Sequence, residues 1–313
     1  MPYNPYDPEK SDFIPVLSPV AAAITGLIFI FFTYQIVGGL ITLALFGFDL
    51  ENAPVNGFRF MTSLGQFLFI LAPALLLSHL VYRNITDIIR IKLPGWKEIA
   101  VFVAGMLIII PLMQELVTVQ NYIIDVIIKS VPVLESVKAV FDELSKTLEG
   151  TYLKLISADN LFELSWVVFI IAFTPAICEE VLFRGFIQKS FEFRMKPLWA
   201  AVITSIFFGM YHFNPFGLFA LILLSFYIGF SAYKSDSIFI PMILHFLNNF
   251  ITVSVFYALG DTELLDPTAV PEGEILYSVI NVVLLSVLFI FFLYIVNKNY
   301  HKIKGGNDDM SEV

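Results

Sequence analysis

Two adjacent carboxylates follow an almost wholly apolar segment of this chain. Glu179 and Glu180 come shortly after the stretch from Leu164 to Phe173. A charged group at bilayer depth costs about 2.5–3.5 kcal/mol on insertion scales, so such groups usually face a protein interior or a water-filled cavity. Ionisable residues in this setting mark function, and we take the two glutamates as the centre of a candidate site.

Helical spacing predicts different partners for the two glutamates. Neighbouring residues on a helix point about 100° apart. Glu180 and Arg184 are four residues apart, so they share a helix face and can form an ion pair. This pairing would neutralise Glu180 and leave Glu179 free for a second role. The non-catalytic alternative is an ion pair at a helix end, with Glu179 in headgroup water.

Two histidines and an asparagine stand in other apolar segments. His212 ends the run that contains Phe208, and His245 lies within a later run together with Asn249. His245 and Asn249 are four residues apart, so they lie one above the other on a helix. A single histidine on an apolar helix is more often a packing residue. Two histidines, an asparagine and two glutamates from three segments are harder to explain by packing alone.

The elements that position these residues must be membrane helices. The 313 residues are 58% hydrophobic and only 14% charged, with a mean hydropathy of +0.82, whereas soluble domains carry about 25% charged residues. A net charge of -9 argues against nucleic acid as a partner. The only cysteine, Cys178, excludes an intramolecular disulfide and a cysteine-based zinc knuckle. We predict an all-α, polytopic integral membrane protein with lipid around it.

About eight apolar runs approach the ~20 residues that a membrane helix needs. Residues 38–39 are both glycine, and we expect a bend in the first run there. With no internal repeat and no low-complexity linker, one membrane domain is the economical interpretation. The predicted spans are Pro19–Phe46, Phe60–Tyr82, Ile99–Leu116, Leu164–Phe183, Leu198–His212, Phe216–Tyr233, Ile238–Leu259 and Ile275–Val296.

Loop charges predict the orientation of these spans. Lys and Arg favour the cytoplasmic side of a membrane. They cluster between the second and third spans, after the fourth and sixth, and after the eighth, whereas the loop Gly260–Glu274 has five acids and no Lys or Arg. Eight spans with both termini cytoplasmic satisfy this pattern. In a prokaryote the membrane would be the cell membrane.

The segment Val117–Glu163 differs from the other connections. Apolar residues recur between Leu134 and Leu148 at spacings of three and four, with charged residues on the other faces. This pattern predicts an amphipathic helix on the outer side. Such a helix can lie in the headgroup plane or cap a cavity between spans.

Three short motifs can be read from these residues: Glu179-Glu180-x-x-x-Arg184, Phe208-x-x-x-His212 and His245-x-x-x-Asn249. Together they resemble the motifs of a known family, the CPBP intramembrane endopeptidases. This family is related to the type II CAAX prenyl endopeptidase and is also called the Abi family. The resemblance covers residues 164–259, which it marks as a catalytic core. Residues 1–163 then hold the N-terminal helices and the amphipathic segment, and residues 260–313 the last helix and tail. The motif residues are Glu179, Glu180, Arg184, Phe208, His212, His245 and Asn249.

The resemblance implies an intramembrane endopeptidase whose substrate is a membrane-associated peptide or protein. It implies that Glu179 activates a water molecule with help from His212, and that His245 and Asn249 bind the oxyanion. Peptide hydrolysis needs a base for water, a proton for the leaving amine and donors for the oxyanion, and these residue types can supply them. The remaining alternatives are a non-catalytic membrane scaffold and a transporter with a polar site at the midplane.

The sequence is compatible with two kinds of mechanism, one with a bound zinc and one without a metal. Glu179, His212 and His245 have the ligand types of a His₂Glu zinc site with one open position. The resemblance favours a glutamate-dependent mechanism that uses no metal, and we predict no cofactor, with zinc as the alternative.

Overall fold

The computed structural model describes residues 16–47, 53–260 and 275–305, and within these ranges it is all-α, without a strand. Seven helices are long and apolar enough to cross a membrane, and a shorter apolar helix, α11, lies among them. The predicted polytopic helical bundle is therefore confirmed. In chain order the long helices are Pro19–Phe46, Val55–Tyr82, Trp96–Ser130, Leu161–Glu192, Pro215–Ser235, Phe239–Leu259 and Ile275–Ile303, and α11 is Pro197–Tyr211.

Several long helices are composed of shorter elements because π-helical segments interrupt them. The first contains α1 (Pro19–Phe31), η1 (Phe32–Gly38) and α2 (Gly39–Phe46). The irregular segment ends at the glycine pair where we expected a bend. The other elements are α3 (Val55–Gln66), η3 (Phe67–Leu71), α4 (Ala72–Tyr82), α5 (Ile85–Ile89), α6 (Trp96–Ser130), η4 (Pro132–Leu134), α7 (Glu135–Ile156), α8 (Leu161–Val168), η5 (Phe169–Phe173), α9 (Thr174–Glu180), η6 (Val181–Ile187), α10 (Gln188–Glu192), η7 (Pro215–Gly217), α12 (Leu218–Ser235), α13 (Phe239–Leu259) and α14 (Ile275–Ile303).

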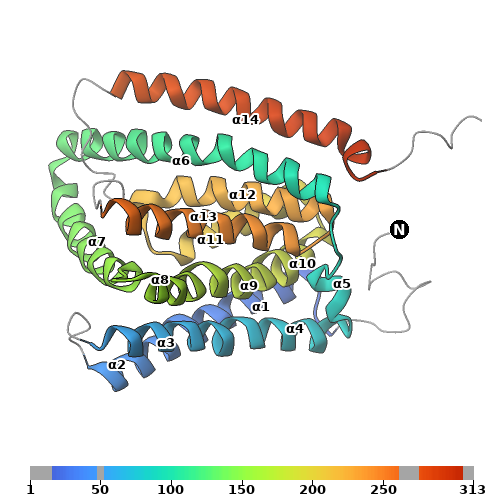
Figure 1. Ribbon diagram of the computed structural model, residues 1–313, viewed down its shortest axis with the longest axis horizontal. Coiled ribbons are helices and arrows are strands. Elements are labelled where there is room, and N and C mark those ends of the chain that lie inside the picture. The colour runs from blue at the N-terminus through green and yellow to red at the C-terminus, as the bar shows by residue number, and fades with distance from the viewer. Residues whose placement is uncertain (1–15, 48–52, 261–274, 306–313) are drawn as a thin grey trace, which may run out of the picture.

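Figure 1 shows the helices lying roughly along one axis, with α14 and α6 at one edge of the bundle and α3 and α4 at the other. One hydrophobic cluster joins α1 and α4 to the helix α8–α10 and to α11. A second cluster joins α6, α12 and α14. The helix α8–α10 lies between the two edges, and every residue of its segment η6 is buried. The two glutamates are therefore carried by the central helix of the molecule.

A glycine allows the loop helix α5 to pack closely on this central helix. A Cβ atom at Gly185 would lie 3.2 Å from the Cα atom of Ile89, which is tighter than ordinary van der Waals contact. Any larger residue would push α5 away from η6. The contact matters because α5 ends at Arg90, whose Nε atom donates to the carbonyl oxygen of Arg184 at 3.3 Å.

The third span is longer than predicted. We expected it to end at Leu116, but α6 continues to Ser130. Polar side chains beyond the predicted end are buried in the bundle: Gln120 donates to the carbonyl of Pro215 at 2.7 Å and accepts from the amide of Phe219 at 3.2 Å. A buried glutamine whose amide is fully paired does not end a helix, because its polar groups need no water.

The amphipathic helix is present as α7, which connects the end of α6 to the start of α8 along one end of the bundle (Figure 1). Buried Arg59 holds the end of α7: its Nε donates to the carbonyl of Leu155 at 3.0 Å, and its Nη1 pairs with Glu163 at 2.6 Å. Whether α7 lies among lipid headgroups stays a prediction.

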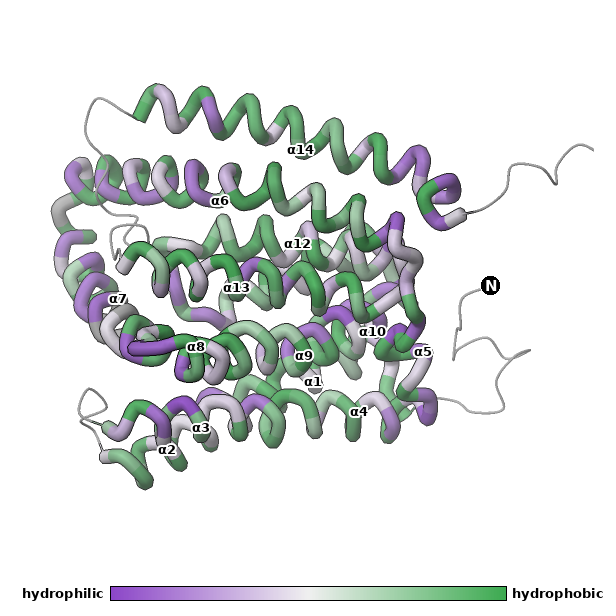
Figure 2. The backbone as a smooth tube through the Cα atoms, in the orientation of Figure 1, coloured by the Kyte–Doolittle hydropathy of each residue, from purple (hydrophilic) through white to green (hydrophobic). Residues whose placement is uncertain are grey.

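The opposite end of the bundle collects most of the basic side chains, and we call it the basic end. It consists of residues 83–97, 189–196, 234–238 and 298–305, and Figure 2 shows hydrophilic colour gathered there. Apart from Arg184, which we expected after the fourth span and which is buried within the helix that continues to Glu192, the four predicted groups of basic residues lie at this one end. The side of the membrane that this end faces stays a prediction. The acidic loop predicted for the outer side falls on residues 261–274, which lie outside the described residues.

Candidate active site

Pro175 shapes the backbone just ahead of the two glutamates. It lies in α9, which has a π-helical segment on either side. Because proline has no amide hydrogen, the carbonyl of Ile171, four residues earlier, loses its helical donor. Asn249 on α13 supplies a donor instead, with its Nδ2 atom 3.0 Å from that carbonyl oxygen. Asn249 therefore links α13 to the helical turn just before the two glutamates, where Pro175 leaves a backbone carbonyl without its helical donor.

Glu180 is fully buried and forms the predicted pair with Arg184. Its Oε1 atom lies 3.0 Å from Nη1 of Arg184, and the arginine is also fully buried. The Nη2 atom of Arg184 donates to both the carbonyl and the hydroxyl oxygen of Ser225, at 3.1 and 2.8 Å. The other carboxylate oxygen of Glu180, Oε2, has no hydrogen-bond partner among the described residues.

His245 makes the second contact with Glu180. Its Nδ1 atom lies 2.6 Å from Oε1, and the ring is almost fully buried. Since a carboxylate can only accept, Nδ1 carries the hydrogen. A neutral His245 would then present a lone pair at Nε2, and only a doubly protonated ring presents an N–H group there.

Glu179 is half-buried and stands apart from this network. No hydrogen bond or ion pair reaches its carboxylate from the described residues. Arg184 and the hydroxyl of Tyr34 lie within electrostatic range of it. The division expected from helical spacing is observed: Arg184 pairs with Glu180, and Glu179 remains without such a partner.

His212 stands at the end of α11 and is exposed. Its Nδ1 atom lies 2.8 Å from the carbonyl oxygen of Phe208, one helical turn earlier. A carbonyl can only accept, so Nδ1 again carries the hydrogen. The neutral ring therefore presents the lone pair of Nε2, which can take a proton.

The ring of Phe208 brings the motif side chains together. The Arg184 guanidinium carbon lies 4.7 Å from its centroid, and the rings of His212 and His245 lie at 4.7 and 6.0 Å. A guanidinium over an aromatic face is attracted by the ring quadrupole. Phe208 therefore forms an apolar surface shared by residues from three separate helices.

We compared the chain with known proteins. Residues 161–251 match the family model described as Rce1-like, type II CAAX prenyl endopeptidase Rce1-like. The matched range therefore resembles the CAAX-type endopeptidases, and we call it the CAAX protease-like core. All six predicted site residues lie in the matched range. No curated protein and no solved structure matches the chain. The match supports an intramembrane endopeptidase of the CAAX type in general, with a lipid environment and a peptide substrate.

The residues of the zinc alternative do not assemble a metal site in the CAAX protease-like core. No group of three or more His, Cys, Asp or Glu side chains is placed to hold a metal within the part of the chain that the structure describes. His245 donates from Nδ1 to Glu180, so only its Nε2 atom would be open to a metal. The absence of zinc from the reaction therefore stays a prediction.

Two residues of the CAAX protease-like core were missed as contributors to the site. Ser225 on α12 holds the far side of the Arg184 guanidinium, and nothing in its apolar surroundings marks it. Phe208 was noticed only as the start of the motif that ends at His212. Its contact with His212 follows from helical spacing, but its contacts with Arg184 and His245 require the tertiary structure, because these two residues lie on other helices.

Proposed function

We propose that this protein hydrolyses a peptide bond of a membrane-associated peptide or protein, with Glu179 as the base that activates water. The supporting observation is the contrast between the two glutamates. Glu180 is neutralised by Arg184 and held by His245, whereas the half-buried Glu179 carboxylate is left without an ion pair. A carboxylate that is not engaged in structure is free to accept a proton.

In this mechanism Glu179 removes a proton from water, and the resulting hydroxide attacks the carbonyl carbon of the substrate. The π electrons of the carbonyl move onto its oxygen, which becomes the oxyanion. The proton held by Glu179 then passes to the leaving nitrogen as the carbon–nitrogen bond breaks. The lone pair on Nε2 of His212 assists by accepting a hydrogen bond or a proton from the same water.

In this proposal His245 and Asn249 each donate one hydrogen bond to the oxyanion. The Nδ1 hydrogen of His245 is used by Glu180, so the ring donates from Nε2 as an imidazolium. One amide hydrogen of Asn249 is used by Ile171, and the second remains for the substrate. Glu180 thus acts as a positioning residue, because it holds and charges the ring that contacts the oxyanion.

The reaction is proposed without metal, and the substrate is proposed to reach the site from the membrane. Chelators should leave the purified protein active, and metal analysis should find well under one zinc per chain. Activity lost on chelation and restored by zinc would contradict the metal-free reaction while leaving the hydrolysis itself in place. We also propose that the basic end and both termini are cytoplasmic, because Lys and Arg gather there.

The test is Glu179→Gln, which removes the base and keeps the shape of the side chain. Turnover should fall about 10²–10⁴-fold, while the melting temperature in detergent stays within about 2 °C of wild type. Two readouts suit an unidentified substrate: cleavage of a quenched fluorescent farnesylated CAAX peptide, and the membrane peptidome of cells that express either form. Glu115→Gln is the matched control, because Glu115 lies on α6 and accepts from Asn281 at 2.8 Å.

Full activity in Glu179→Gln would show that another group is the base. Identical peptidomes from cells with wild type and Glu179→Gln, together with no cleavage of the peptide, would favour the scaffold or transporter alternative. His245→Gln should retain more activity than His245→Ala, because the glutamine amide can still donate to an oxyanion.

A further inference from the structure

Phe213, the residue that follows His212, has a strained backbone. It comes directly after the end of α11 and has a φ of 49°. Many helices end on a residue in this left-handed region, and that residue is usually glycine or sometimes asparagine, because a Cβ atom makes the conformation costly. A bulky side chain in this region is an outlier, so phenylalanine is an unfavourable local choice here.

The chain carries an asparagine one residue later but uses it for another purpose. The Oδ1 atom of Asn214 accepts from the backbone amides of Phe216 and Gly217, both at 3.1 Å. Asn214 therefore caps the short helix η7. The left-handed position between α11 and η7 is left to Phe213.

Packing within the protein does not account for a phenylalanine at this position. Two other residues with positive φ, Arg90 and Asp236, are held by an ion pair with each other. Phe213 has no charge and is 49% exposed, so its burial offsets little of the strain. Strained residues cluster at active sites and ligand-binding positions. Phe213 is in such a position, because it follows His212 directly.

Five aromatic rings, which we call the aromatic row, connect Phe213 to the ring shared by the motif side chains. Neighbouring centroids along the row lie 5.0, 5.5, 5.4 and 5.9 Å apart. The buried end of the row contacts Arg184, and the other end is its most exposed member. In order, the rings belong to Phe208, Phe183, Tyr211, Phe31 and Phe213.

The first helix fixes the outer part of the aromatic row, although this helix lies outside the matched range 161–251. The Nε2 atom of Gln35 donates to the carbonyl of Tyr211 at 3.2 Å, and the hydroxyl of Tyr211 donates to the carbonyl of Leu27. Phe31 is four residues from each of these two anchors, and its ring contacts Phe213. Phe31 and Phe213 therefore form a supported apolar surface at the end of α11.

We infer that Phe213, supported by Phe31, is a specificity-determining residue that contacts an apolar side chain of the substrate next to the cleaved bond. This inference rests on the proposed function. Because Phe213 follows His212, a group that covers its ring lies close to the bond that would be hydrolysed. A half-exposed aromatic ring gains free energy when an apolar group covers it. Glycine or asparagine would supply the turn but not this surface, which explains why the strain is kept.

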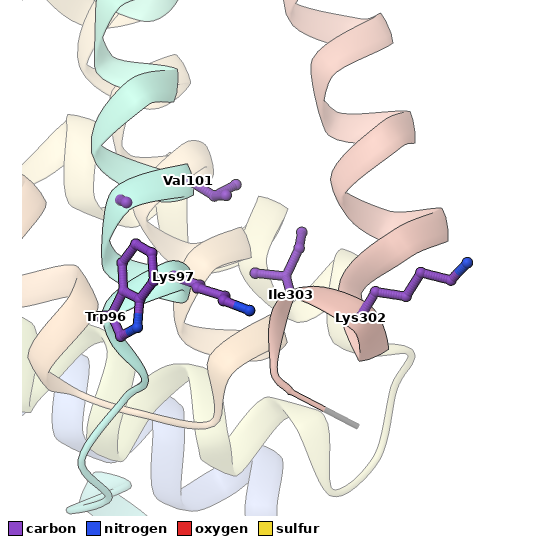
Figure 3. A pocket seen from close by; sticks show the side chains of 6 residues that line it. Trp96, Lys97, Val101, Lys302 and Ile303 are labelled. Carbon is purple, nitrogen blue, oxygen red and sulfur yellow. The ribbon is translucent and has the colours of Figure 1, made fainter. Parts of the chain in front are cut away.

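The pocket at the basic end is a different place. It lies between the first turns of α6 and the last turn of α14, and Figure 3 shows Trp96, Lys97 and Ile303 among its lining residues. Helix α11 begins at Pro197 beside the basic end, and its 15 residues rise about 22 Å from there. No member of the aromatic row lines this pocket. The surface around Phe213 is therefore separate from it.

The experiment separates the ring of Phe213 from its backbone. Phe213→Ala removes the ring and keeps the Cβ atom, whereas Phe213→Gly removes both. Relief of strain should give Phe213→Gly a melting temperature in detergent about 2–3 °C above that of Phe213→Ala. Activity should not follow this difference, because both variants lack the ring.

The readout is the cleavage of two quenched fluorescent farnesylated peptides that differ only in the residue after the cleaved bond, valine in one and serine in the other. Wild type should prefer the valine peptide in kcat/KM. Phe213→Ala and Phe213→Gly should both lower this preference about tenfold. Phe213→Leu should keep most of the preference, because its side chain is still apolar. Glu179→Gln is assayed beside them to test the hydrolysis itself.

The control is Phe29→Ala, which should leave the preference unchanged. Phe29 lies on the first helix and is 48% exposed, so it matches Phe213 in type and exposure but lies outside the aromatic row. An equal loss of preference in Phe29→Ala would overturn the inference, because the effect would not be specific to the aromatic row.

Three further results would overturn the inference while the proposed hydrolysis stands. They are an unchanged preference in both Phe213→Ala and Phe213→Gly, a preference restored in Phe213→Gly relative to Phe213→Ala, and equal cleavage of the two peptides by wild type. The second result would assign residue 213 a backbone role only. A wild type that cleaves neither peptide would overturn the proposed function together with this inference.

Discussion

Two buried arginines organise two different regions of this protein. Arg184 lies at the centre of the bundle, where it pairs with Glu180 at 3.0 Å. Arg90 lies at the basic end, where it pairs with Glu192 at 2.6 Å and with Asp236 at 3.3 Å. The regions touch, because Arg90 also donates to the main-chain carbonyl of Arg184 at 3.3 Å.

The two regions differ in how completely their polar atoms are paired. At the basic end, Lys92 and Lys189 join Arg90 around Asp236, and Arg90 also donates to the carbonyl of Ala232 at 3.2 Å. The Nη2 atom of Arg90 makes no hydrogen bond of good geometry, but it lies 2.6 Å from a carboxylate oxygen of Glu192. At the centre, Oε2 of Glu180 and Nε of Arg184 have no hydrogen-bond partner among the described residues. Buried polar groups are usually paired, so unpaired ones call for an explanation. The proposed function would explain the unpaired atoms at the centre, because the substrate would bind in that region.

The basic end also holds strained backbone in place. Arg90 and Asp236 both end their helices in the left-handed region, with φ of 63° and 50°. This conformation costs about 1–2 kcal/mol for a residue with a Cβ atom. The ion pair between these two residues offsets part of that cost and fixes the ends of α5 and α12 together. The comparison therefore sets a structural charge cluster beside one that is proposed to serve catalysis.

The largest effect is expected at the central arginine. Arg184→Met should destabilise the protein by about 3–5 kcal/mol, because Glu180 would remain buried without its permanent counter-charge, and His245 balances it only when protonated. Thermal unfolding in detergent measures this, with exposed Lys196→Met as the control. The variant that combines Glu180→Gln with Arg184→Met should recover part of the loss. A loss no larger than that of the control would contradict the buried ion pair.

A smaller loss is expected at the other arginine. Arg90→Met should cost about 1.5–3 kcal/mol, since Asp236 keeps Lys92 and Lys189 as partners. The same unfolding measurement applies. If Arg90→Met destabilised the protein as much as Arg184→Met, the contrast between a redundant and a non-redundant charge cluster would be wrong.

Substitutions at Asn249 and Pro175 can distinguish a structural role of Asn249 from a catalytic role. Asn249→Ala should cost about 1 kcal/mol, because the carbonyl of Ile171 loses its donor. In a Pro175→Ala background an amide at position 175 can serve that carbonyl, so the stability cost of Asn249→Ala should shrink. Turnover should stay about 10²–10³-fold low in both backgrounds if Asn249 also binds the oxyanion. Recovery of turnover together with stability would assign Asn249 a structural role only.

The smallest effect concerns pH at the basic end. Burial alone would raise the pKa of the Asp236 carboxyl, but the charges of Lys189, Arg90 and Lys92 and the hydrogen bond from Lys92 outweigh burial and lower it. A lowered pKa means that Asp236 contributes stability above its ordinary value of 3.8 and loses this contribution as pH falls through the folded value. The stability difference between wild type and Asp236→Asn should therefore be constant at neutral pH and shrink below about pH 4. A difference that grew on acidification would contradict the ion pairs.

The amino-acid sequence by itself determined the membrane helices of this protein, because long apolar runs are recognisable from composition. Long apolar runs identified every candidate span, and i,i+4 spacing predicted that Arg184 pairs with Glu180. The predicted end of α6 was wrong because the apolar run stops at Leu116, whereas the helix continues through the buried polar residues Gln120 and Asn121. Their burial depends on which helix lies beside them, which a single run of sequence does not contain.

Tertiary structure alone decided how the site is connected. Helical spacing could show that His245 and Asn249 share a face, but only packing brought His245 to Glu180 and Asn249 to Ile171. The same is true of Ser225 and of the cluster around Arg90, whose partners lie on other helices. Contacts within one helix follow from its fixed rise and twist, whereas contacts between helices follow from the packing of the whole bundle.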